Sequence, residues 1–187
     1  MITILDYGAG NLRSVQNTLA ELNCPHTLAR DSAALGAAAR ILLPGVGHFG
    51  QMMRALDAMG VREALLDRIR AGVPFFGICL GMQALFESSE EAPDVRGMAL
   101  YPGTVRRFPM DARVPHMGWN QLEPGGRHVY FAHSYYVPEC PQTSAACTYA
   151  DIRFTAMLRA GNVHGVQFHP EKSGSTGLAI VKDFLEC

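Results

Sequence analysis

The sequence feature that most constrains this chain is a cysteine with a glycine two residues away on each side, in Gly77-Ile78-Cys79-Leu80-Gly81. The apolar run Phe75 to Cys79 predicts a strand, and Leu80 to Glu87 predicts a helix that follows without a linker. Such a sharp turn strains the backbone at its tip and brings neighbouring strands so close that larger side chains at the glycine positions would collide. The pattern therefore predicts a nucleophile elbow with Cys79 at its tip.

This position would also make the Cys79 thiol reactive. The free N–H groups and the dipole at a helix N-terminus favour a thiolate. A buried core cysteine is the alternative, because free cysteine is often just that, but the strand before it and the helix after it favour the nucleophile. The other cysteines are scattered and form no C-x-x-C pair, so we expect neither a disulfide framework nor a metal site. They are Cys24, Cys140, Cys147 and Cys187.

A histidine and a glutamate near the C-terminus are placed to serve this thiol. His169 follows the apolar run Val163 to Phe168, which puts it at the carboxyl edge of a strand, where open parallel sheets usually carry their sites. Glu171 lies two residues on, and in an extended segment it would point the same way as His169. We predict a triad in which His169 moves protons and Glu171 orients it. Three other histidines are candidates to line a cleft: His48, His116 and His133.

A glycine-rich turn supplies candidates for an oxyanion site. Pro44-Gly45-Val46-Gly47 follows a predicted strand and contains two glycines. Attack on an amide creates a negative oxygen, which backbone N–H groups must stabilise. The N–H of Leu80, next to the nucleophile, is one natural donor, and Val46 or Gly47 is expected to bring the second. An ordinary turn is the alternative, and the neighbouring elbow favours the oxyanion interpretation.

The first half of the chain alternates strands and helices, which predicts a parallel sheet with helices on both faces. Strands are expected at Met1 to Asp6, Arg40 to Leu43 and Phe75 to Cys79, and helices at Leu12 to Leu22, Gln51 to Met59 and Val61 to Ala71. The second half favours short strands and a final helix. These are expected at Thr104 to Phe108, Val129 to Phe131, Phe154 to Leu158, Val163 to Phe168 and Gly174 to Cys187.

Composition excludes several classes of function. Hydrophobic residues make up 48% of the 187 residues and charged residues 18%, which fits one globular domain spanning 1–187. A formal net charge of −1 gives no electrostatic reason to expect nucleic acid or an anionic membrane as partner. The glycine loop Asp6 to Asn11 is neither a dinucleotide fingerprint nor a P-loop, so we expect no cofactor. Without a predicted leader or membrane span, we expect a cytoplasmic protein.

Several motifs together resemble a known family. Gly-Ile-Cys-Leu-Gly-Met-Gln at 77–83, Pro-Gly-Val-Gly at 44–47 and His-Pro-Glu at 169–171 resemble the class I, triad-type glutamine amidotransferases. A more specific resemblance, to the glutaminase subunits of imidazole glycerol phosphate synthase, rests on three further motifs and on Lys172-Ser173. These motifs are Asp-Tyr-Gly-Ala-Gly-Asn at 6–11, Pro-His-Met-Gly-Trp-Asn at 115–120 and Phe-Ala-His-Ser-Tyr-Tyr at 131–136. The similarity runs almost the full length.

The resemblance implies a flavodoxin-like, three-layer α/β fold with a mostly parallel central sheet and a smaller antiparallel strand set. It implies that glutamine is hydrolysed through a γ-glutamyl thioester. The ammonia passes to a (β/α)₈-barrel cyclase, which makes imidazole glycerol phosphate and aminoimidazole carboxamide ribotide in histidine biosynthesis. Residues that would hold glutamine are Gly47, Leu80, Gln83, His133, Ser134 and Tyr135. Residues expected to face the cyclase are Asn11, Trp119, Asn120 and Lys172.

Three alternatives remain open from the sequence. One is an amidotransferase subunit that feeds a different synthase, against which the motif at 115–120 argues. The second is a catalytically silent binding subunit, against which the intact triad pattern argues. The third is a cysteine peptidase or another hydrolase on a similar fold, which a label directed at Cys79 would distinguish.

Overall fold

The computed structural model describes residues 1–9 and 11–187, and its centre is a seven-stranded sheet in the order β10-β11-β12-β4-β3-β1-β2. Five neighbouring strands are parallel, in the flavodoxin-like order β2-β1-β3-β4-β12. They are β1 (Ile2–Leu5), β2 (His26–Ala29), β3 (Ile41–Leu43), β4 (Phe75–Ile78) and β12 (Val163–Val166). Beyond β12, the strands β11 (Ile152–Ala160) and β10 (Thr143–Tyr149) continue the sheet to its edge in antiparallel pairing.

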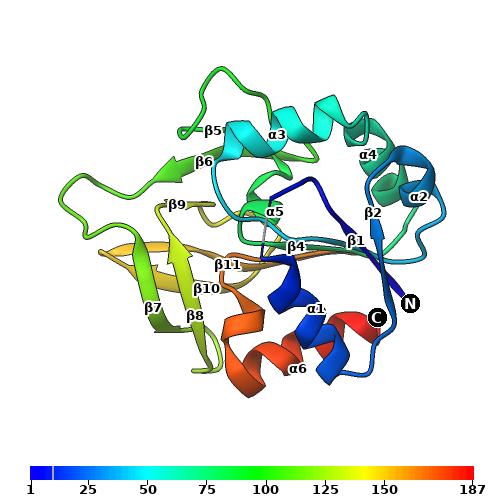
Figure 1. Ribbon diagram of the computed structural model, residues 1–187. Helices are drawn as coiled ribbons and strands as arrows, with labels where there is room; N and C mark the ends of the chain where they lie inside the picture. Colours follow the sequence, from blue (N-terminus) through cyan, green and yellow to red (C-terminus); the bar gives the residue numbers. More distant parts are fainter. Residues whose placement is uncertain (10) are drawn as a thin grey trace.

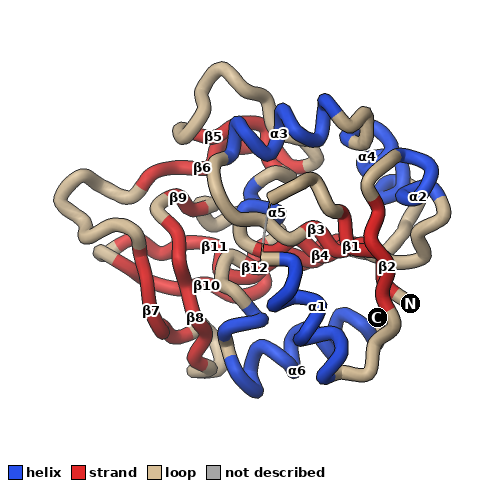
Figure 2. Tube along the Cα trace, in the orientation of Figure 1, coloured by secondary structure: helices blue, strands red, loops and turns tan. Residues whose placement is uncertain are grey.

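Helices cover both faces of the sheet and complete three layers (Figures 1 and 2). One face carries α1 (Leu12–Glu21) and α6 (Gly174–Leu185). The other carries α2 (Ser32–Gly36), α3 (Phe49–Ala58), α4 (Arg62–Arg70) and the single turn α5 (Leu80–Gln83). In the part of the chain that the structure describes, no helix has the length and apolar character needed to cross a membrane.

Alternation along the central strands divides the core into two clusters. Ile41 and Leu43 of β3 pack in the cluster under α3 and α4, while Leu42 packs in the cluster with α1 and α6. Successive side chains of a strand point to opposite faces, so a short, fully apolar strand feeds both clusters. In the second cluster the rings of Phe76 and Phe184 stack with centroids 5.0 Å apart, which holds α6 against the sheet.

A second group of strands lies beside the sheet, at the left of Figure 1, away from both chain termini. Strands β7 (His116–Gln121) and β8 (His128–His133) form an antiparallel pair. A three-stranded unit contains β5 (Phe86–Ser89), β6 (Tyr101–Arg107) and β9 (Tyr135–Tyr136), in which β5 and β6 are parallel and β6 and β9 antiparallel. This group and the ends of β3, β4 and β12 surround the candidate site.

The structure corrects several local predictions. The helix after Cys79 ends at Gln83 instead of continuing to Glu87, because Phe86–Ser89 pairs with β6 as strand β5. Asn11, a residue type that often caps helices, comes directly before α1, but its side chain makes no capping hydrogen bond. Several elements were not predicted, because their sequences carry weak periodicity, among them β2, β7, β9, β10 and the short helix α2. Strand β2 forms by pairing with β1, whereas β7 and β10 each pair with the strand that follows them.

Candidate active site

Cys79 sits on a strained elbow between β4 and α5. Its φ of 51° and ψ of −108° lie where side-chain-bearing residues rarely occur. A Cβ on Gly77 would lie 2.6 Å from the Gly81 carbonyl oxygen, and a Cβ on Gly81 would lie 2.1 Å from the Leu43 carbonyl oxygen. Both neighbours are backbone atoms that cannot move aside. The close approach of β3, β4 and α5 therefore requires both glycines, as the sequence pattern indicated.

The same close packing places the glycine-rich turn after β3 against the elbow. A Cβ on Gly45 would lie 2.3 Å from the Gly81 nitrogen and 2.7 Å from the Leu80 Cβ. Gly47 adopts a φ of +98°, which favours glycine. The predicted oxyanion residues Val46, Gly47 and Leu80 consequently line one cavity with Cys79.

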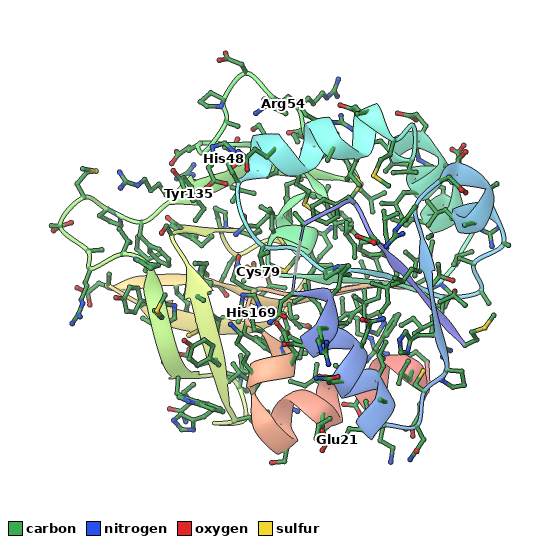
Figure 3. All side chains as sticks on the ribbon, in the orientation of Figure 1. Glu21, His48, Arg54, Cys79, Tyr135 and His169 are labelled. Carbon is green, nitrogen blue, oxygen red and sulfur yellow. The ribbon has the colours of Figure 1, made fainter. Side chains whose placement is uncertain are left out.

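His169 and Glu171 lie next to the elbow on the segment after β12. Figure 3 labels His169 just below Cys79 near the centre of the molecule. His169 Nδ1 is 2.9 Å from Glu171 Oε1, and the two side chains are 5% and 3% exposed. The segment is not extended as predicted, since Pro170–Lys172 forms a 3₁₀ turn, η1. Glu171 therefore reaches the imidazole by curling back, while His169 remains in extended geometry.

Two opposing effects act on the imidazole of His169. Burial disfavours the charged ring, whereas hydrogen bonding to Cys79 and to Glu171 favours it. The favourable contacts prevail and raise the pKa of His169 to about 10. The ring is thus stabilised as an imidazolium beside the cysteine sulfur.

A cavity of about 340 Å³ opens beside the sulfur. It brings together most of the predicted site residues: Val46, Gly47, Cys79, Leu80, Gln83, His133, Ser134, Tyr135 and His169. Glu171 does not line the cavity, because it lies behind His169. Lys172, predicted to face a partner, also lines the cavity.

Sequence reasoning missed one charged residue of this cavity, Glu91. Its Oε2 accepts a hydrogen bond from the Phe49 N–H at 2.7 Å, at the first residue of α3. The carboxylate thus holds the helix that begins two residues after Gly47, and it gives the cavity a negative group. No local motif marks Glu91; only its position after β5 brings it to the site. Pro115 and Ala132 also line the cavity; they belong to the motifs at 115–120 and 131–136 but were not predicted as site residues.

His133 is held by a chain of hydrogen bonds that starts at the surface. Its Nδ1 is 2.8 Å from the Tyr135 carbonyl oxygen, which can only accept, so this nitrogen carries the proton. His133 Nε2 then accepts from His116 Nδ1 at 3.0 Å, and His116 Nε2 accepts from Asn120 Nδ2 at 3.2 Å. Both ring nitrogens of His133 are used within the protein, which leaves its backbone to contact a ligand.

The two histidines of this chain are neutral. Burial lowers the pKa of His116 to about 4. Burial likewise lowers the pKa of His133, to about 3, with a smaller contribution from the nearby His116 and His169. His116 also stacks between the rings of Phe131 and Tyr149, with centroids 4.7 and 4.0 Å away. His116 and His133 are therefore buried on strands β7 and β8, whereas the third predicted cleft histidine, His48, is half-buried before α3, where its Nδ1 accepts from the Gly50 N–H at 3.1 Å.

The residues predicted to face a partner lie in different settings, and the neighbours Trp119 and Asn120 point to opposite faces of β7. Trp119 is 57% exposed, and the neighbouring Met117 is 64% exposed. Asn120 is half-buried and uses its amide on His116 and on the Thr148 carbonyl. Lys172 lies 5.8 Å from the Tyr130 ring centroid, and Asn11 is half-buried. Within residues 1–9 and 11–187, no group of three or more acidic, histidine or cysteine side chains is arranged to hold a metal ion.

Solved structures share the fold at low sequence identity. A crystal structure of a glutamine amidotransferase matches with a TM-score of 0.79 and 20% identity, covering 99% of this chain and 97% of that chain. The PurLQS structure from Thermotoga maritima matches with a TM-score of 0.69 and 20% identity, covering 99% and 97%.

The fold and the site define the class of protein as a triad-type, cysteine-dependent amidotransferase. The family model for class-I glutamine amidotransferases matches residues 3–187. The imidazole glycerol phosphate synthase subunit HisH of Thermus thermophilus is 49% identical, covering 95% of this chain and 93% of that protein. The chain therefore belongs to the class-I glutamine amidotransferase family and, within it, to the HisH subunits of imidazole glycerol phosphate synthase.

Two more distant relatives agree with this assignment. The HisH subunit of Methanothermobacter thermautotrophicus is 43% identical, covering 100% of this chain and 98% of that protein. The chloroplastic imidazole glycerol phosphate synthase hisHF of Arabidopsis thaliana is 44% identical over 99% of this chain but only 34% of its own length. This chain thus corresponds to one part of that longer plant protein.

Proposed function

We propose that this chain hydrolyses glutamine to glutamate and ammonia through a thioester at Cys79, and that the ammonia passes to a cyclase subunit in histidine biosynthesis. The observation that carries the proposal is Cys79 at φ 51° on the elbow, beside an imidazole that Glu171 holds at 2.9 Å. Membership of the HisH subunits supports the choice of glutamine over other amides.

The reaction starts from an ion pair of the Cys79 thiolate and the His169 imidazolium, which the raised pKa of His169 favours. The sulfur attacks the carboxamide carbon, and N–H groups of the Val46-Gly47 turn and of Leu80 receive the oxyanion. His169 gives its proton to the leaving nitrogen, and ammonia departs. His169 then takes a proton from water, which attacks the thioester and releases glutamate and the thiolate. Glu171 keeps the tautomer of His169 throughout.

The cavity offers suitable contacts for the rest of glutamine. Gln83 donates both protons of its amide within the protein, so its Oε1 stays free to accept from a ligand. Backbone groups of Gly47, Ser134 and Tyr135 provide further polar contacts at the wall. The Glu91 carboxylate is the acidic group that suits the α-ammonium of the amino acid. These residues, together with Leu80 and His133, make up the proposed glutamine site.

We further propose that the partner is a (β/α)₈-barrel cyclase that docks on the side bearing Asn11, Trp119, Asn120 and Lys172. The exposed Met117 and Trp119 give this side an apolar centre, which stable interfaces favour. The chain would form one glutaminase domain over 1–187, because its first and last parallel strands share one sheet. We propose that it acts in the cytoplasm.

Replacing Cys79 tests the proposal. The Cys79→Ala variant should lose glutamine hydrolysis, while its complex with the cyclase should still make product from added ammonia. Cys187→Ala is the matched control, because Cys187 is exposed at the end of the chain and outside the cavity. Glutamine hydrolysis in Cys79→Ala at the rate of the unchanged protein would exclude the proposed nucleophile.

A further inference from the structure

Besides Gln83, a second glutamine side chain lies near the site, and the proposed reaction does not use it. Gln167 lies between β12 and His169, and its side chain is fully buried. Its Nε2 is 3.5 Å from the Cys79 Sγ. Gln167 and His169 are two residues apart, and both side chains reach the Cys79 sulfur. That spacing is the signal in the sequence that could have marked Gln167.

The orientation of this amide follows from its neighbours. The Tyr135 carbonyl can only accept, so Gln83 must turn its NH₂ group toward it, at 2.9 Å. The same NH₂ group donates to the Gln167 Oε1, also at 2.9 Å. If the Gln167 amide were reversed, two NH₂ groups would face each other. Gln167 is therefore compelled to point its own N–H at the sulfur.

The Tyr135 carbonyl, at which this chain of hydrogen bonds begins, is itself held in place. The Tyr135 carbonyl accepts from Gln83 and also from His133 Nδ1, at 2.8 Å. Two donors occupy its two lone pairs, so the carbonyl has no freedom to turn away. The order in this hydrogen-bonded chain runs from the backbone at Tyr135, through two amides, to the nucleophile.

We propose that Gln167 is a further catalytic residue, which donates its amide N–H to the Cys79 sulfur and stabilises the thiolate over the thiol and the thioester. A charged sulfur is a much better acceptor than a neutral one. The donor therefore increases the fraction of thiolate before attack. It also assists the sulfur as leaving group when water cleaves the thioester. This inference rests on the proposed function, in which Cys79 is the nucleophile.

Other titratable groups near the sulfur bear on any pH measurement. His169, backed by Glu171, approaches it from the segment after β12. Tyr7 approaches from the end of β1, and burial raises the pKa of Tyr7 to about 12. Glu91 and Lys172 lie across the cavity, where His133 is neutral. A substitution at Gln167 leaves all of these groups in place.

The test is the pH dependence of Cys79 alkylation by iodoacetamide, followed by mass spectrometry of the Cys79 peptide, in Gln167→Met. This variant keeps the length of the side chain and removes the donor. The midpoint of the alkylation profile should rise by about one pH unit, and kcat should fall roughly 10-fold, with KM for glutamine changed less than about threefold. Gln142→Met is the matched control, because Gln142 lies outside the cavity, and it should behave as the unchanged protein.

Two further measurements keep the inference open to refutation if Gln167→Met folds poorly. Gln167→Asn retains polarity but withdraws the amide from the sulfur, and it should shift the profile in the same direction. In the unchanged protein, the side-chain amide proton of Gln167 should shift in NMR spectra as the sulfur titrates. An alkylation profile like that of the unchanged protein in a folded variant, or an amide signal that does not move, overturns the inference. Glutamine hydrolysis in Cys79→Ala at the rate of the unchanged protein would instead overturn the proposed function.

Discussion

The two walls of the site are built by different physics. The wall formed by β3, β4 and α5 depends on backbone atoms in near contact. Strands β3 and β4 pair directly, and α5 follows β4 in the sequence. The opposite wall, from the β7–β8 pair and β9, depends on side-chain hydrogen bonds between residues on different strands. The first wall tolerates no added atom, whereas the second requires each polar partner to be present.

This difference has a consequence for what each wall can tolerate. A steric wall fails through strain and loss of folding, because an inserted Cβ must displace a backbone carbonyl. A hydrogen-bonded wall fails through an unsatisfied or newly charged group, because His116 and His133 are buried and neutral. Substitutions in the two walls should therefore differ in the property that they change, folding in one and hydrogen bonding or charge in the other, as well as in the magnitude of the effect.

The largest effect is expected at the steric wall, in Gly81→Ala. The new Cβ would lie 2.1 Å from the Leu43 carbonyl oxygen, so the free energy of unfolding should fall by about 3 kcal/mol or more and glutaminase activity should be lost. Gly36→Ala is the control, because a Cβ there meets open space. Urea unfolding of both variants checks the prediction, and equal stability would show that the elbow can relax.

The next effect concerns the carboxylate behind His169, in Glu171→Gln. Glu171 supports the charge on His169, and its loss should reduce kcat at least about 100-fold. Because the contact raises the pKa of His169, removing it should lower that pKa and move the alkaline limb of the kcat profile to lower pH. The exposed residue Glu186 provides the control, Glu186→Gln, which should leave both quantities unchanged. A normal kcat would remove Glu171 from the mechanism.

A smaller effect, on binding alone, is expected at the outer face of the hydrogen-bonded wall. Trp119→Ala should weaken cyclase binding by about 2 kcal/mol, since exposed aromatic residues often dominate interfaces. Hydrolysis of glutamine by the isolated subunit should stay within about twofold. Met110→Ala serves as the comparison, because Met110 is 81% exposed and is not among the residues proposed to dock. Calorimetric titration with cyclase decides whether Trp119 is needed.

The smallest effect is a change in acid stability at the hydrogen-bonded wall. The pKa of His116 is lowered in the folded protein to about 4. Between pH 6.5 and 4, His116 is therefore protonated in the unfolded chain but neutral in the folded chain. Stability therefore falls as pH falls through this window, by about 1.4 kcal/mol per unit for one group. In His116→Gln, the loss of stability between pH 7.5 and 5.5 should be about 1 kcal/mol smaller. His128→Gln, on the exposed face of the same hairpin, should keep the original loss. An unchanged pH dependence in His116→Gln would mean that the chain can accept the proton.

The sequence predicted one wall of the site far better than the other. The elbow at Cys79, the turn at 44–47 and the His169–Glu171 pair were all visible, because glycine spacing and i, i+2 spacing are local properties. Glu91 was not predicted because no local motif marks it, and Gln167 was not predicted although it lies two residues before His169. The helix after Cys79 was predicted too long because pairing of Phe86 with Tyr101 overrides local periodicity.

What the sequence by itself determined is the strained turn that carries Cys79 and the alternating α/β order, because steric exclusion and hydrophobic periodicity act over a few residues. What only the tertiary structure decided is the order of the strands and the orientation of every polar group around the sulfur. Gln83 lies 52 residues from Tyr135 and 84 residues from Gln167, and the direction of each amide is set by a partner that folding brings within 2.9 Å. Hydrogen-bond direction is a property of the assembled neighbours, so it appears only when the chain has folded.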